Sequence, residues 1–124
     1  MPRANPKTIL VVDDEPDIRE VARIALEMED YRVEVAANGV EALEMVAASM
    51  PDLVLLDVKM PVMDGRTFAR EYQARHNHPV PIIVMTAAAD ARMRAHEMGA
   101  TGWIGKPFDL DELLETVGRY LDCP

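Results

Sequence analysis

The stretch LVLLDVKMPVMDG, residues 53–65, joins a wholly apolar segment to a carboxylate. Four large apolar residues, Leu53–Leu56, run directly into Asp57. A continuous apolar run of this kind is typical of a strand buried on both faces, as in a parallel sheet covered by helices. Because an acidic group follows the buried run without a break, the end of this strand is predicted to be a functional position.

Other parts of the chain repeat this pattern. ILVV at 9–12 and IIVM at 82–85 are also continuous apolar runs, whereas RVEVA at 32–36 and GWIG at 102–105 predict more exposed or edge strands. Helical stripes lie between and after them: Ile18, Val21, Ala22 and Ala25; Ala42, Leu43, Val46 and Ala47; Leu110, Leu113, Leu114, Val117 and Leu121; with weaker candidates at 65–75 and 89–98. Five strand–helix repeats predict a doubly wound α/β sandwich with a five-stranded parallel sheet.

The size and charge of the chain limit the classes of function. A length of 124 residues is expected to form one domain. A net charge of −9, without clusters of Lys and Arg, argues against direct nucleic-acid binding. The opening residues are too short and polar for a signal peptide, and no apolar run reaches transmembrane length, so no membrane association is expected. The single cysteine, Cys123, favours a reducing, cytoplasmic location.

Polar side chains follow four of the five expected strands. Asp13 and Asp14 come after the first strand, Asp57 after the third, Thr86 after the fourth and Lys106 after the fifth. In an open parallel sheet, ligands bind at the carboxyl ends of the strands. These five side chains are therefore expected to converge at one edge of the sheet.

The expected cluster has a definite chemistry. Three neighbouring carboxylates repel one another, and a hard divalent cation with oxygen ligands, Mg²⁺, relieves that repulsion. Lys106 adds a positive charge and Thr86 a hydroxyl donor, which together suit the oxygens of a phosphoryl group. Asp57 would then be the nucleophile and become an acyl phosphate.

Each of these residues also has a purely structural interpretation. Asp14 can cap the first helix, with Pro16 in the first turn and Asp17 at the capping-box position. Asp57 can form a turn, Thr86 is common at a strand end, and Lys106 can be a solvated loop residue. Their joint placement after separate strands of one sheet favours the functional interpretation.

Four segments resemble the receiver (response regulator) domain of two-component signalling, in its chemotaxis-regulator-like form. They are ILVVDDEPDIR, LVLLDVKMPVMDG, PIIVMTA and GWIGKPFDLDEL, and they extend over nearly the whole chain. The resemblance implies a flavodoxin-like strand order, 2-1-3-4-5, and a single receiver domain over 1–124 with its core at 7–121.

The resemblance also implies roles for individual residues. Asp57 would be the phosphoacceptor. The ligands of Mg²⁺ would be Asp13, Asp14, Asp57 and the backbone carbonyl of Lys59. Thr86 and Lys106 would contact the phosphoryl group, and the Lys106–Pro107 peptide bond would be cis.

A sensor histidine kinase or a histidine phosphotransfer protein would be the phosphodonor in such a domain. The domain would act as a signalling switch rather than a metabolic enzyme, although it would catalyse its own phosphotransfer and dephosphorylation. Phosphorylation would draw Thr86 inward and turn the aromatic residue Trp103. The face formed by the fourth helix, fifth strand and last helix would then change and bind an unidentified protein target, with the chain a monomer or a weak phosphorylation-dependent dimer.

Four positions depart from, or modulate, the family pattern. Trp103 stands where Tyr or Phe is usual, and its bulk and N–H group work against full inward rotation. Gly105 gives the lysine loop extra freedom, and Ala88 leaves the loop after Thr86 small. Lys59 places a long cation at the mouth of the site and is predicted to alter the lifetime of the acyl phosphate.

Other functions and arrangements remain open from the sequence. A haloacid-dehalogenase-type phosphatase also uses an Asp nucleophile, but it needs an Asp-x-Asp-x-Thr pattern where this chain has DDEPD. A flavin-binding module would need a phosphate-cradling loop in place of Asp13 and Asp14. The chain is expected to be a stand-alone regulator, with a receiver fragment of a multidomain regulator carrying a DNA-binding or enzymatic output as the alternative.

Overall fold

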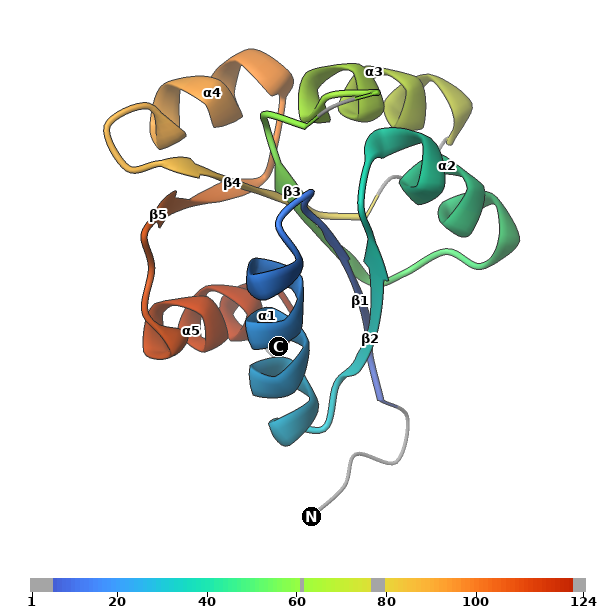
Figure 1. The fold of residues 1–124 in the computed structure, drawn as a ribbon. Helices are drawn as coiled ribbons and strands as arrows, with labels where there is room; N and C mark the ends of the chain where they lie inside the picture. The colour runs from blue at the N-terminus through green and yellow to red at the C-terminus, as the bar shows by residue number, and fades with distance from the viewer. Residues whose placement is uncertain (1–5, 61, 77–79, 122–124) are drawn as a thin grey trace.

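The computed structural model describes residues 6–60, 62–76 and 80–121, and Cys123 lies outside this part. Five strands alternate with five helices along the chain (Figure 1). They are β1 (Thr8–Val12), α1 (Pro16–Met28), β2 (Arg32–Ala36), α2 (Gly39–Ala48), β3 (Leu53–Asp57), α3 (Gly65–Arg75), β4 (Ile82–Ala87), α4 (Ala91–Met98), β5 (Gly102–Lys106) and α5 (Leu110–Leu121).

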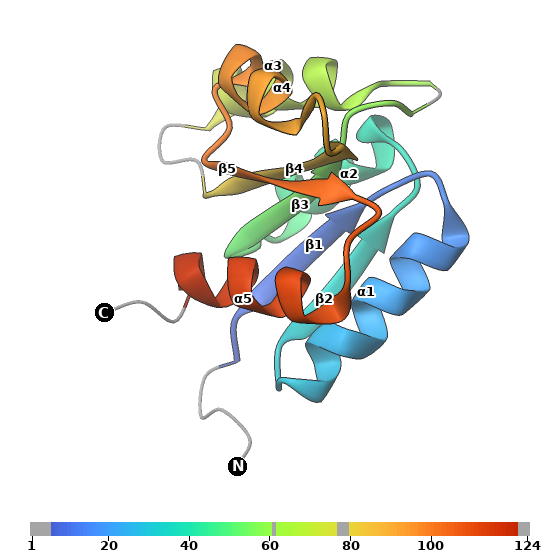
Figure 2. The ribbon, with the colours of Figure 1, turned by 90° about the vertical axis from the view of Figure 1, so that its left-hand side faces the viewer.

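The five strands form one parallel sheet in the order β2-β1-β3-β4-β5. Helices α1 and α5 cover one face of this sheet, and α2, α3 and α4 cover the other (Figures 1 and 2). The doubly wound (βα)5 sandwich and its strand order are therefore confirmed. The order reverses between β1 and β3, and this is the point at which an open parallel sheet forms its ligand crevice.

The core lies on both faces of the sheet, as the continuous apolar runs predict. In β1, Leu10 and Val12 pack towards α2, α3 and α4, whereas Ile9 and Val11 pack towards α1 and α5. All of Leu53–Leu56 is 0% exposed. Because β3 is the central strand, between β1 and β4, its apolar residues are covered on both faces of the sheet up to Asp57.

Three predicted helical stripes are wider than the buried strips in the structure, because Ala47 of α2 and Leu110 of α5 are exposed as well as Val21 of α1. In α1 the buried residues are Ala22, Ala25 and Leu26, whereas Val21 is 47% exposed. The helix touches the sheet and α5 over a narrow strip, so the periodic pattern identifies the buried side but overestimates its width. Val21 consequently remains available to line a surface cavity.

The start of α3 is packed directly against the end of β3. The Asp64 side chain caps this helix by accepting a hydrogen bond from the Thr67 N–H group at 2.8 Å. The Gly65 N–H group donates to the Val58 carbonyl at 2.9 Å. A Cβ atom added to Gly65 would lie 2.2 Å from the Asp57 carbonyl oxygen, so only glycine fits here.

We expect Gly65→Ala to lower the free energy of unfolding by about 2 to 3 kcal/mol, because its methyl group must displace the backbone of Asp57 and Val58. Urea unfolding followed by circular dichroism measures this. Gln73→Ala, at an exposed position of the same helix, is the control and should change stability by less than about 0.5 kcal/mol. Equal stability of Gly65→Ala and the wild type would contradict the assigned close approach.

Candidate functional site

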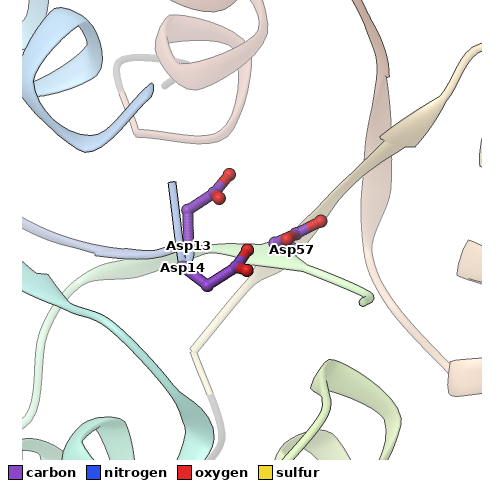
Figure 3. Close-up of side chains that lie close together, drawn as sticks. All are labelled: Asp13, Asp14 and Asp57. Atoms are coloured by element: carbon purple, nitrogen blue, oxygen red, sulfur yellow. The ribbon is translucent and has the colours of Figure 1, made fainter. Parts of the chain in front are cut away.

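Three carboxylates meet at the carboxyl ends of β1 and β3 (Figure 3). Asp13 and Asp14 follow β1 directly, and Asp57 is the last residue of β3. One oxygen from each side chain can be chosen such that all three lie within 4.8 Å of one another. Asp13 and Asp57 are buried, whereas Asp14 is exposed, so the group is anchored in the core and opens to solvent on one side.

Asp13 is fixed by hydrogen bonds on both oxygens of its side chain and on its carbonyl. Its Oδ1 accepts from the Glu15 N–H group at 2.9 Å, and its Oδ2 accepts from Lys106 Nζ at 2.7 Å. Arg19 Nη1 donates to the Asp13 carbonyl oxygen at 2.7 Å. The turn that carries the acidic pair is therefore held from α1 and from β5 together.

The sequence analysis did not identify Glu15 or Arg19 as residues of the site. A charged residue in the first turns of an amphipathic helix has no feature that marks it as a partner of the preceding strand. The alternative interpretation of Asp14 as the cap of α1 is wrong, because the capping position is Glu15 and no side chain caps this helix. Pro16 does occupy the first turn.

Lys106 joins β5 to the acidic group. Besides Asp13, its Nζ lies 3.5 Å from Asp57 Oδ1 and 3.5 Å from Glu15 Oε1. Burial disfavours the charged ammonium group, but the hydrogen bond and charge of Asp13, with the charges of Asp57 and Glu15, prevail and raise the pKa of Lys106. The lysine is thus held in its charged form between the carboxylates.

Asp57 lies in an environment that disfavours the charged form of its carboxylate. Its pKa is raised from 3.8 to about 7, chiefly by burial and then by the negative charges of Asp13 and Asp14, while Lys106 partly opposes the rise. Any positive charge added near Asp57 would stabilise the ionised form of its carboxylate. Three oxygen-donating side chains around one point fit a hard divalent cation, and Asp57 is the group that such a cation would keep ionised.

Of the remaining predicted residues, Thr86 and Lys59 line the same cavity as Asp57, whereas Trp103 does not. Thr86 is buried near the end of β4, where it pairs with Gly105 of β5. Lys59 is exposed. Trp103 is 47% exposed on β5, opposite Val84 in the sheet register.

A cavity of about 580 Å³ lies above the acceptor. Asp57, Thr86 and Lys106 line its floor, and Lys59 lies at its edge. Its walls are partly apolar and come from Ile18 and Val21 of α1 and from Phe108 after β5. The sequence pattern did not indicate these apolar walls. It predicts Ile18 and Val21 as part of a buried helical stripe, and nothing in it marks Phe108 as a site residue.

The loop after β4 rests closely on β5. The Ala88 N–H group donates to the Lys106 carbonyl at 3.3 Å. A Cβ atom on Gly105 would lie 2.6 Å from the Ala88 Cβ atom, so the absence of a side chain at Gly105 permits this approach. The Lys106–Pro107 peptide bond that follows is cis. Thr86, Ala88 and Lys106 therefore belong to one tightly packed unit.

Comparisons with known proteins agree with this geometry. Residues 9–118 match the family described as the response regulator receiver domain. The response regulator MprA of Mycobacterium ulcerans is 44% identical over 115 residues, which are 91% of this chain and 49% of MprA. The chemotaxis response regulator CheY4 of Vibrio cholerae is 35% identical with a TM-score of 0.85, over 94% of this chain and 100% of CheY4.

A third protein is similar throughout its length. The response regulator TrrA of Thermotoga maritima, whose structure was solved in complex with Mg²⁺-BeF, is 39% identical with a TM-score of 0.83, over 93% of this chain and 99% of TrrA. The chain therefore belongs to the response regulator receiver family. The phosphatase and flavin-binding alternatives are set aside accordingly.

Some of the related proteins are much longer than this chain. The chain spans about half the length of the curated MprA relatives that it matches. The receiver of NtrX from Brucella abortus is likewise one part of a larger protein, because the match covers 27% of that chain. None of the helices in the described part of this chain combines the length and apolar character needed to cross a bilayer.

We expect metal-free Asp57→Asn to be more stable than the wild type at pH 8, by about 1 to 3 kcal/mol. The folded-state pKa of Asp57, about 7, exceeds its ordinary value of 3.8, so the folded wild type binds more protons and loses stability as the pH rises from about 4 to 7. Urea unfolding in EDTA between pH 4.5 and 8 measures the difference between the two proteins.

Asp64→Asn is the contrasting control. The hydrogen bond from Thr67 lowers the pKa of Asp64, so this substitution should destabilise the protein at neutral pH and approach the wild type in acid. A stability difference for Asp57→Asn that does not vary with pH would contradict the environment assigned to Asp57.

Proposed function

We propose that the chain is a phosphoacceptor receiver that takes a phosphoryl group on Asp57 from a phosphohistidine. One observation carries this proposal: Asp57 lies beside Asp13, Asp14 and Lys106 at the carboxyl end of the sheet in a chain of the receiver family. The donor would be a sensor histidine kinase or a histidine phosphotransfer protein. The cofactor would be Mg²⁺, held by Asp13, Asp14, Asp57 and the backbone carbonyl of Lys59.

The chain's own residues supply most of the required chemistry. A carboxylate oxygen of Asp57 attacks phosphorus, the P–N bond breaks, and the imidazole nitrogen keeps the electron pair. Lys106, at 3.5 Å from Asp57, neutralises charge on the phosphoryl oxygens, and the Thr86 hydroxyl donates a hydrogen bond to one of them. Mg²⁺, when held by Asp13, Asp14, Asp57 and the Lys59 carbonyl, would supply further positive charge. Later, water attacks phosphorus and releases inorganic phosphate, which regenerates the carboxylate.

The output of the switch would pass through the packed unit of Thr86, Ala88 and Lys106. A move of Thr86 towards the phosphoryl group would carry the loop with it and alter the face of α4, β5 and α5. Trp103 would respond on this face, where its exposure of 47% leaves room for a change of environment. A downstream protein would read this face, with the receiver a monomer or a weak phosphorylation-dependent dimer.

The proposal also concerns the scope of the protein. We propose one receiver domain over residues 1–124, in the bacterial cytoplasm, acting as a stand-alone regulator. MprA and NtrX, in which the matching part is a fraction of the whole protein, support the alternative of a receiver joined to an output domain.

Trp103 fluorescence tests the proposed function, since Trp103 is the only tryptophan. We expect one change on adding Mg²⁺ and a second on adding a small phosphodonor or beryllofluoride. Asp57→Asn should lose the second change and the mass increase of one phosphoryl group. Asp52→Asn is the matched control, because Asp52 precedes the same strand and accepts a hydrogen bond from Thr8 at 2.8 Å. It should behave like the wild type.

The mass measurement decides the outcome for the acceptor. A phosphoryl adduct that persists in Asp57→Asn would show another acceptor, and the absence of any adduct in the wild type would refute the proposal. An adduct without a fluorescence change would leave Asp57 as the acceptor and exclude Trp103 as a reporter of activation.

Lys59→Ala should shorten the lifetime of the acyl phosphate, by about two- to tenfold. Lys59 lines the cavity over Asp57, and removal of its long side chain opens a route for water. The decay of phosphorylated protein, followed by intact mass, measures the rate. Lys59→Met keeps the bulk without the charge and should decay at nearly the wild-type rate, whereas an unchanged rate in Lys59→Ala would refute the role of Lys59.

A further inference from the structure

A second cavity, of about 570 Å³, opens beside the acceptor between α3 and α4. Three cationic side chains line it: Lys59 from the loop after β3, Arg66 from α3 and Arg94 from α4. Asp14 and Asp64 line it as well. The cavity adjoins the acidic cluster through Asp14 and shares Lys59 with the cavity over the acceptor, whereas Asp57, Thr86 and Lys106 line only that other cavity.

The charge around this second cavity differs from that of the rest of the protein. Residues 59–98 contain six Lys or Arg and four Asp or Glu, which give a net charge of +2. All other residues contain seven Lys or Arg and eighteen Asp or Glu, a net charge of −11. The side chains that line the cavity carry three positive and two negative charges, so the cavity has a small positive excess in a strongly acidic chain, and positive charge attracts anions.

The arginines of the cavity are incompletely paired. Arg94 Nε is buried and has no hydrogen-bond partner among the described residues. Arg66 is half exposed and reaches Glu97 only at 3.5 Å. Asp64 is engaged as the cap of α3, through Thr67. Because a buried guanidinium N–H without an acceptor is costly, a rearrangement of Arg94 that gave its Nε–H group an acceptor from a ligand would be favourable.

We propose that this cavity is a binding site for a small anion that carries phosphate or carboxylate groups. Its volume is that of a small-molecule site. The planar fork of a guanidinium matches the oxygens of both groups, and two forks from neighbouring helices would grip a ligand with two anionic groups. The bound anion would link α3 to α4 and contact Lys59 at the edge of the acceptor. This site does not depend on the phosphoacceptor function proposed for Asp57.

Titration with pyrophosphate and with citrate tests the proposal. The experiment uses Mg²⁺-free protein at constant ionic strength and follows backbone amide shifts by NMR. At least one of the two anions should bind saturably, with shifts concentrated in α3, α4 and the loop carrying Lys59. The comparison of the two anions distinguishes a phosphate site from a carboxylate site.

Four variants locate the site. Arg94→Gln should weaken binding at least tenfold, and Arg66→Gln should weaken it as well. Arg92→Gln, at an exposed position of α4 that does not line the cavity, should bind like the wild type. Arg94→Lys keeps the charge without the fork and should also weaken binding, which tests the site even if Arg94→Gln does not fold.

Several results would overturn the proposal. They are the absence of saturable binding by either anion, and an equal loss in Arg92→Gln and Arg94→Gln. Binding of a polyglutamate peptide without binding of either small anion would also overturn it and would place a protein segment on this face.

Discussion

The ion pair between Lys106 and Asp13 connects the two halves of the site. A carboxylate with 0% exposure is tolerated because Lys106 Nζ lies 2.7 Å from it, and the lysine in turn is kept charged by that carboxylate. Removing Lys106 would leave the buried carboxylate of Asp13 without its positively charged partner. The pair also ties the end of β5 to the end of β1 across the intervening strands β3 and β4, which fixes the space above Asp57.

The excess of negative charge at this edge of the sheet makes the site sensitive to the binding of a cation. Asp57 is buried beside two other carboxylates; burial and their negative charges raise its pKa, and the single positive charge of Lys106 opposes this only in part. A cation and a phosphoryl group therefore enter a site whose charges are incompletely balanced. The packing that holds the strand ends in place also keeps the three carboxylates close together. Their mutual repulsion is relieved when a cation binds among them.

Much of the fold was predictable because each buried strand is a continuous apolar run. The convergence of Asp13, Asp14, Asp57 and Lys106 followed from the position of each residue after a strand, since parallel strands end at one edge. The contacts of Glu15 and Arg19 with this group were not predictable. They depend on how α1 is rotated against the sheet, which a helical period does not define to within one side chain. The exposure of Val21 has the same origin.

The close contact between Gly105 and Ala88 has a consequence for the evolution of this chain. A Cβ atom at Gly105 would fall 2.6 Å from the Ala88 Cβ atom, so a larger side chain at either position needs the loop after β4 to withdraw from β5. The two positions are thus constrained as a pair. Among descendants of this sequence that keep the same loop conformation, we expect enlargement at one position to be absent unless the loop has already been remodelled.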